Sequence, residues 1–237
     1  MPEHQPYKDN TYTDCLIIPI LENEEIITQI PEKYEMLHPT ITTLVETKDF
    51  EAKALQQATV YEKNSGHKRI LLIGVGKKED LTIEAWKKTI GTAVRTAQDK
   101  KSTIITIHFP KWATEHFKKN HSITESVIAA HIATYSFDTH KDKEAETTKV
   151  MTIYWDHQNP ADKELWELST QNAVHIAESV NLARHLGNTP PSEMTPASLA
   201  KEAEDLGKTF PKLSVNVLDR SQIEEHGMGC LIGVSQG

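Results

Sequence analysis

Short apolar runs alternate with amphipathic stretches along the first two thirds of the chain. Runs typical of buried strands lie at residues 14–20, 69–76, 102–109 and 149–155. Residues 41–45 and 58–63 are further strand candidates. The Asn-Ser-Gly sequence at 64–66 favours a hairpin that joins the second candidate to the run at 69–76.

Helical spacing of apolar residues separates these runs. Thr82 is the predicted N-cap of a helix, and Ser122 to Glu125 form a predicted capping box for another. Residues 141–149 are charged and poor in apolar side chains, which predicts an exposed loop. Strands that alternate with helices predict an α/β domain with a mixed, largely parallel sheet and helices on its faces.

A long helix is predicted after the last strand. Asn159-Pro160 has the residues of a helix start, and Gly187-Asn188 those of a helix end. Its predicted apolar stripe consists of Leu165, Leu168, Ile176, Val180, Ala183 and Leu186.

The last 48 or so residues predict only a few elements. Thr195 is the predicted cap of a helix that closes at Gly207, and residues 213–218 alternate like a strand. A capping box at Ser221 opens a short helix that stops at Gly227, and residues 230–234 begin a strand or helix. These elements are too few for an independent core, so we expect this part to need a partner or a continuation.

Composition narrows the class of protein. The chain has 38% hydrophobic and 25% charged residues and a net charge of −8, typical of a soluble globular protein. Its N-terminus lacks an apolar signal core and no run is long enough to span a bilayer, so the sequence predicts a cytoplasmic protein without membrane contact. The acidic balance argues against nucleic acid as a partner. Cys15 and Cys230 are expected to be small buried hydrophobic residues.

The chemistry-bearing residues form no catalytic pattern. Gly74-Val-Gly76 lacks the third glycine of a dinucleotide fingerprint, because position 79 is Glu, and a strand-ending turn is expected instead. Phe137 to His140, near Asp142 and Glu144, is expected to be a helix-end loop. His116 and His121 are poorly spaced for zinc, and Ser235 lies in no nucleophile elbow. The sequence therefore assigns no catalytic, cofactor-binding or metal-binding residue.

Several segments, in the same order, resemble one family. The segment NLARHLGNTPPSEMTP at 181–196, followed by GMGCLIGVSQG at 227–237, is similar to the leucyl aminopeptidase (cytosol aminopeptidase) family of metallopeptidases. Residues 14–20, 68–77 and 135–141 also resemble family segments. His185 stands where Asp is common, and Pro191-Ser192 stand where Ala-Asn is common, which bears on how the domains pack.

The resemblance implies a macro-domain-like, three-layer N-terminal domain without catalytic residues. It also implies a catalytic domain that binds two divalent metals, zinc or manganese, and removes N-terminal residues such as Leu from peptides in a hexamer. The family's metal-ligand segments are absent here, since Asn188-Thr189 is followed by Pro190. We therefore expect a non-catalytic domain over 1–155, a linker helix and turn over 156–189, an incomplete catalytic domain over 190–237, and an inactive chain without bound metal.

Three hypotheses follow for the function. In the first, the catalytic part of an aminopeptidase is missing from this sequence, which ends at Gly237 within a predicted element. In the second, the chain is a non-catalytic binding or regulatory module that pairs with an aminopeptidase or with a separate catalytic half. In the third, it is a macro-like domain that binds ADP-ribose or another nucleotide.

Overall fold

A computed structural model describes residues 1–8, 11–22, 24–142, 148–157 and 163–236. The chain divides into two compact units, Met1–Leu182 and Ala183–Gly237.

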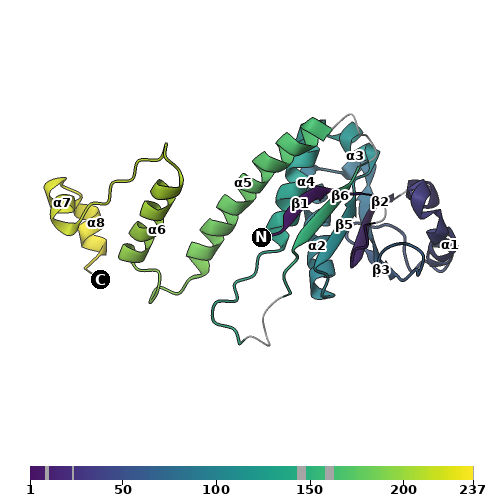
Figure 1. Ribbon diagram of the computed structural model, residues 1–237, viewed down its shortest axis with the longest axis horizontal. Helices are drawn as coiled ribbons and strands as arrows, with labels where there is room; N and C mark the ends of the chain where they lie inside the picture. Colours follow the sequence, from purple (N-terminus) through teal and green to yellow (C-terminus); the bar gives the residue numbers. More distant parts are fainter. Residues whose placement is uncertain (9–10, 23, 143–147, 158–162, 237) are drawn as a thin grey trace. The chain divides into compact units, whose positions relative to one another are not determined.

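The first unit is built on one six-stranded sheet (Figure 1). Its strands are β1 (Glu3–Pro6), β2 (Cys15–Glu22), β3 (Gln57–Val60), β4 (Ile70–Lys77), β5 (Ile104–His108) and β6 (Thr152–Asp156). The order across the sheet is β1-β6-β5-β2-β4-β3. All neighbours are parallel except β3, which runs antiparallel to β4. This confirms the predicted α/β class with a mixed, largely parallel sheet and the predicted β3–β4 pair.

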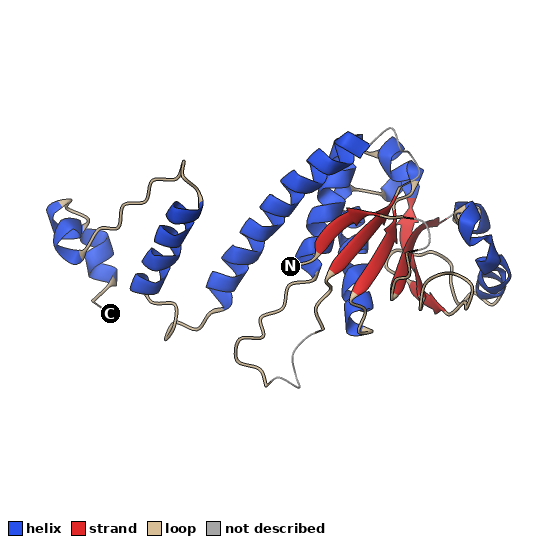
Figure 2. Cartoon of the chain, in the orientation of Figure 1, coloured by secondary structure: helices blue, strands red, loops and turns tan. Residues whose placement is uncertain are grey.

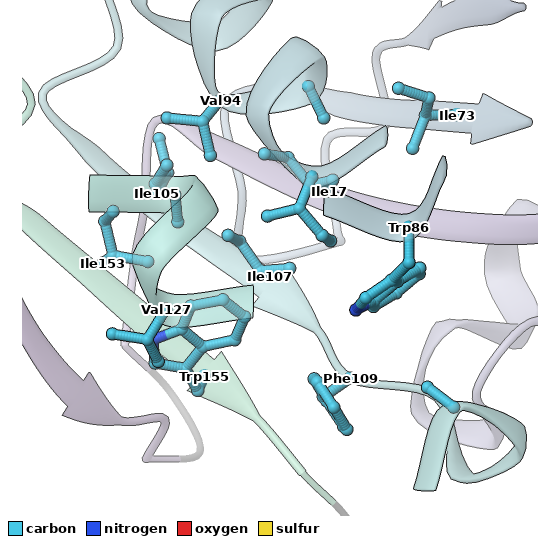
Figure 3. Packing of buried hydrophobic residues seen from close by; sticks show 14 of the residues in the cluster. Ile17, Ile73, Trp86, Val94, Ile105, Ile107, Phe109, Val127, Ile153 and Trp155 are labelled. Carbon is cyan, nitrogen blue, oxygen red and sulfur yellow. The ribbon is translucent and has the colours of Figure 1, made fainter. Parts of the chain in front are cut away.

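Helices cover one face of the sheet and form the larger part of the core. They are α2 (Ile83–Asp99), α3 (Lys111–His116), α4 (Lys119–Ala133) and the first part of α5 (Lys163–Asn188). In Figure 3, Ile17, Ile105 and Ile153 of the sheet meet Val94 of α2 and Val127 of α4. Burial of these branched side chains supplies the main driving force for this layer.

The opposite face carries a thinner layer. The short 3₁₀ helices η1 (Ile27–Gln29) and η2 (Glu32–Leu37) and the helix α1 (His38–Glu46) pack over β2 and β4. Leu37 and Ile41 lie against the sheet in a second hydrophobic cluster. A third 3₁₀ helix, η3 (Lys78–Asp80), follows β4. The unit thus has three layers, with the sheet in the middle (Figure 2).

The second unit is made of helices: the end of α5, then α6 (Pro196–Thr209), α7 (Arg220–Glu225) and α8 (Gly229–Val234). Thr195 caps α6 as predicted, with its Oγ1 accepting a bond from the Ser198 amide at 3.2 Å. Among the described residues after Ala183, no side chain is fully buried. This unit therefore has no hydrophobic core of its own.

The predictions for residues 41–45 and for Ser122 were wrong. Residues 41–45 belong to helix α1, because Leu37, Ile41 and Leu44 at helical spacing face the sheet and tertiary packing overrides their β-branched neighbours. Ser122 does not cap α4, which begins at Lys119. The buried Ser122 hydroxyl instead donates to the Lys119 carbonyl at 2.9 Å.

The predicted stripe of α5 was also wrong, except at Leu165, which packs against the core. The buried positions are Trp166, Ser169, Ala173, Ala177 and Asn181, whereas Leu168 and Ile176 are 57% and 48% exposed. Small residues let the helix approach the sheet domain closely, which an apolar count does not reveal. The helix continues through Gly187 to Asn188, and its predicted start at 159–162 lies outside the described residues, as do 143–147 of the predicted loop.

Predictions in the second unit were partly wrong. Residues 213–218 have no strand partner among the described residues and are irregular. The capping box of α7 uses Asp219 and Gln222 instead of Ser221. Residues 229–234 form the short helix α8, one of the two predicted alternatives, and α6 ends at Thr209, two residues beyond the predicted Gly207.

Candidate functional site

A hollow of about 580 Å³ lies at the carboxyl ends of β2 and β5. The segment after β2 leads to β4 on one side of β2, and the chain then returns from β4 to β5 on its other side. The neighbours β2 and β5 therefore form the topological switch point of the sheet, where α/β proteins characteristically bind ligands. The hollow's walls come from the segment with η1 and η2 and from residues 108–112.

A buried chain of polar contacts reaches this hollow. His108, the last residue of β5, lines the hollow and is 3% exposed. Its Nδ1 lies 3.2 Å from Oδ2 of Asp156, the last residue of β6. The other oxygen, Oδ1, accepts a bond from Lys33 Nζ at 2.6 Å. Strand order explains the meeting, because β5 and β6 are neighbours and His108 pairs with Asp156 in register.

These contacts fix the charge state of Asp156. Burial alone would raise the pKa of its carboxyl group, but the hydrogen bonds from His108 and Lys33 outweigh burial and hold the pKa below its ordinary value. Asp156 is therefore a carboxylate that accepts hydrogen bonds only. A His108 ring with one proton therefore carries it on Nδ1, facing this carboxylate, and has its acceptor on Nε2.

A second polar group lies on the same face of the sheet. His67 Nδ1 is 2.7 Å from Thr13 Oγ1, and its Nε2 is 3.2 Å from the Tyr34 hydroxyl. Burial, with the nearby Lys33 ammonium, lowers the pKa of His67 to about 4, although Asp156 opposes this shift. His67 is therefore neutral at pH 7 and serves as a structural link.

The hollow combines an apolar base with a charged rim. Ile30, Pro31 and Pro110 are buried at its wall, and Trp112 is half-buried there. Glu32 and Glu35 are exposed on η2 at the rim. His38 Nε2 and Trp112 Nε1 are buried without a hydrogen-bond partner among the described residues. Both atoms are inaccessible to solvent, so they are enclosed by the fold and do not face the open hollow.

Sequence reasoning named neither His108 nor Asp156. The detectable signal is that each is a polar residue at the carboxyl end of a buried strand. Their contact depends on strand order, which the sequence does not state.

The two glycines of Gly74-Val-Gly76 have structural roles. They lie inside β4, which continues to Lys77, so the expected strand-ending turn was wrong. A Cβ on Gly74 would lie 2.1 Å from the Lys53 carbonyl oxygen, and Gly76 has a φ of +86°. Both are required for close approach of the segment after α1.

The other residues that the sequence analysis considered make contacts within the fold or are exposed. Asp138 follows α4 and binds Ser136 and Lys141, each at 2.6 Å, which agrees with a helix-end loop. His116 Nε2 contacts the Leu81 carbonyl at 2.8 Å, whereas His121 is exposed on α4. The exposed Ser235 donates to its own helix. Glu144 lies outside the described residues.

The cysteines differ from each other. Cys15 is buried as expected, and burial raises the pKa of its thiol to about 12. Cys230 is exposed, so its expected burial was wrong, because the second unit has no core to receive it. In the part of the chain that the structure describes, no three His, Cys, Asp or Glu side chains are grouped to hold a metal. No helix there is long and apolar enough to cross a membrane.

Known proteins resemble this chain over nearly all its length. A probable cytosol aminopeptidase of Alkalilimnicola ehrlichii is 28% identical over 232 residues, which covers 97% of this chain and 46% of that protein. A probable cytosol aminopeptidase of Ralstonia pickettii is 29% identical, and this chain covers 46% of that protein. The chain spans about half the length of these curated relatives.

The fold agrees with a solved structure, a mutant of tomato leucine aminopeptidase. The TM-score is 0.74 at 21% identity, with 94% of this chain and 45% of that chain covered.

Two family models match consecutive parts of the sequence. The catalytic-domain model of the cytosol aminopeptidase family matches residues 181–237. The N-terminal-domain model of the same family matches residues 17–144, which is more than half of the chain. The chain therefore belongs to the cytosol aminopeptidase family.

Proposed function

We propose that this chain is part of a metal-dependent aminopeptidase that releases N-terminal residues, of the leucine type, from peptides. One observation carries the proposal: the two family models match in order, first at residues 17–144 and then at 181–237. In this proposal, residues 1–155 are a non-catalytic domain, 156–189 are a linker helix and turn, and 190–237 are the beginning of the catalytic domain.

The metal centre belongs to other segments of the proposed enzyme. A solved structure of the bottromycin maturation enzyme BotP, with a TM-score of 0.60 and 14% identity, is a complex with Mn. The described residues of this chain do not fit such a centre, because no three metal-ligating side chains gather. We propose that two divalent ions, zinc or manganese, are bound outside these 237 residues, so that this chain alone is inactive.

The surface of the second unit supports its role as part of a larger domain. Phe210, Leu213 and Leu231 are 55%, 45% and 54% exposed. Exposed apolar side chains at this density call for further protein surface to cover them. A continuing catalytic domain supplies that surface in the proposal.

The decisive test is made on the protein from its natural source. We expect an intact subunit mass well above the 26.7 kDa of this chain, and release of leucine from leucyl p-nitroanilide that requires Mn²⁺ or Zn²⁺ and stops with EDTA. The 237-residue chain, assayed in parallel, is expected to release none.

A native mass of 26.7 kDa with no activity would contradict the proposal. That result would favour a non-catalytic module that pairs with a separate catalytic half, and co-purification would identify the partner. The mass of the native assembly tests the further proposal that the enzyme is a hexamer. Fractionation of source cells tests a cytosolic location.

A further inference from the structure

We propose that the switch-point hollow, the cavity between the segment with η1 and η2 and residues 108–112, binds a small amine with an apolar body and a charged ammonium group. All the residues involved belong to the first unit. The proposal is therefore independent of the aminopeptidase activity and of any metal.

The apolar wall of the hollow fits a hydrocarbon body. Ile30, Pro31 and Pro110 are buried around it, and Ile27 and Trp112 are half-buried. Contact with these side chains removes apolar ligand surface from water, at about 25 cal/mol for each Å² buried. A volume of about 580 Å³ accommodates a small molecule.

His108 supplies a directed acceptor for the ammonium group. The Asp156 carboxylate can only accept, so a His108 ring with one proton carries it on Nδ1 and has its lone pair on Nε2. Nε2 has no hydrogen-bond partner among the described residues, although the side chain is only 4% exposed. An ammonium group donates to such an acceptor, whereas a carboxylate or phosphate cannot.

The rim adds negative charge. Glu32 and Glu35 have no ion-pair partner within the described chain, whereas Glu24 is paired with Lys78 and Lys111 with Glu115. The hollow therefore favours a cation and repels an anion. This opposes the hypothesis of an ADP-ribose or other nucleotide site at the same place, because two phosphates would face these carboxylates.

Binding is tested by NMR titration of the ¹⁵N-labelled 237-residue chain with isopentylamine at low ionic strength. Isopentanol and 4-methylpentanoate are the matched neutral and anionic probes, and ADP-ribose is the nucleotide probe. With isopentylamine, we expect the amide signals of residues 27–38 and 108–112 to shift. Isopentanol is expected to bind at least about tenfold more weakly, and 4-methylpentanoate and ADP-ribose are expected not to bind.

Three variants separate the contributions. His108→Asn keeps an amide donor near Asp156 but lacks Nε2, and we expect it to weaken amine binding about tenfold. The double variant Glu32→Gln with Glu35→Gln changes only exposed side chains and is also expected to weaken binding about tenfold. Glu46→Gln, an exposed change on α1 outside the hollow, is the matched control and is expected to bind like the parent.

Three results would overturn the proposal. One is equal binding of isopentylamine and isopentanol, and another is a set of shifted amides that lie away from the hollow. The third is unchanged amine affinity in the double glutamate variant, which tests the site even if His108→Asn does not fold. Tight binding of ADP-ribose with the same shifts is a fourth such result, and it would replace the amine proposal with the nucleotide hypothesis.

Discussion

Two buried histidines on one face of the sheet differ in the partners of their ring nitrogens. Nδ1 of His108 lies 3.2 Å from the Asp156 carboxylate, and Nδ1 of His67 lies 2.7 Å from the Thr13 hydroxyl. Nε2 of His67 also has a partner, the Tyr34 hydroxyl at 3.2 Å. Both ring nitrogens of His67 thus have partners in the fold, whereas Nε2 of His108 has none among the described residues.

At Asp156, loss of the charge is expected to destabilise the protein. Asp156→Asn leaves Lys33 without its ion pair and His108 with a weaker acceptor, and we expect the free energy of unfolding to fall by about 2 kcal/mol. Urea denaturation at pH 7 measures this change. Asp205→Asn, at an exposed ion pair with Lys208, is the control and is expected to leave stability unchanged. Equal effects of the two substitutions would show that the buried ion pair contributes no more to stability than the exposed one.

At His67, the pKa of about 4 predicts a specific pH dependence. Above about pH 6.5 both folded and unfolded forms are neutral, and below it the unfolded form binds the proton first. Stability is therefore lost as the pH falls from 6.5 towards 4, by about 2 kcal/mol between pH 7.5 and 5. The measurement compares urea denaturation of the parent with His67→Gln at both pH values. A variant that loses as much stability as the parent would contradict the assignment.

At the scale of elements, the sequence pattern predicted the strands and helices that are determined by local runs of residues. The buried strands β2, β4, β5 and β6 and the helix α2 follow from apolar runs and a cap. It failed where tertiary packing chose between alternatives, as in α1 and in the buried face of α5. The candidate site could not be predicted because His108 and Asp156 are brought together by strand order alone.

The corrected face of α5 is tested by two adjacent residues. Ile176 is 48% exposed and Ala177 is fully buried. Ile176→Glu is expected to change stability by less than about 0.5 kcal/mol, and Ala177→Glu to destabilise by about 3 kcal/mol because it buries an unpaired carboxylate. Thermal or urea denaturation of the two variants shows which of the two positions is buried. The reverse order would restore the apolar stripe that the sequence predicted.

Strand β4 depends on the absence of a side chain at position 74. Gly74→Ala places a methyl group 2.1 Å from the Lys53 carbonyl oxygen, and we expect a loss of at least about 3 kcal/mol. Gly187→Ala has open space in α5 and is expected to stabilise the helix by up to about 1 kcal/mol. Comparison of the unfolding curves of the two variants with that of the parent chain tests both expectations. A mild effect at Gly74 would mean that the neighbouring segment can move aside.

At the scale of the whole molecule, the two units differ in how many hydrophobic side chains they bury. The first has two hydrophobic clusters, and the second has no buried side chain among its described residues. In the isolated 237-residue chain, we expect amides of α6, α7 and α8 to exchange at least about a hundredfold faster than those of β2 and β4. Hydrogen exchange with mass spectrometry measures both. Equal protection would show that the second unit is stable without additional protein.

The pairing of β1 with β6 has a consequence for how the molecule is made. Glu3 at the start of the chain pairs with Thr152, so the first strand has no partner until nearly all of the first unit has been synthesised. The strands β2, β4 and β5 can pair before that point, because they emerge earlier. The N-terminal strand is therefore added late, after the central strands have emerged.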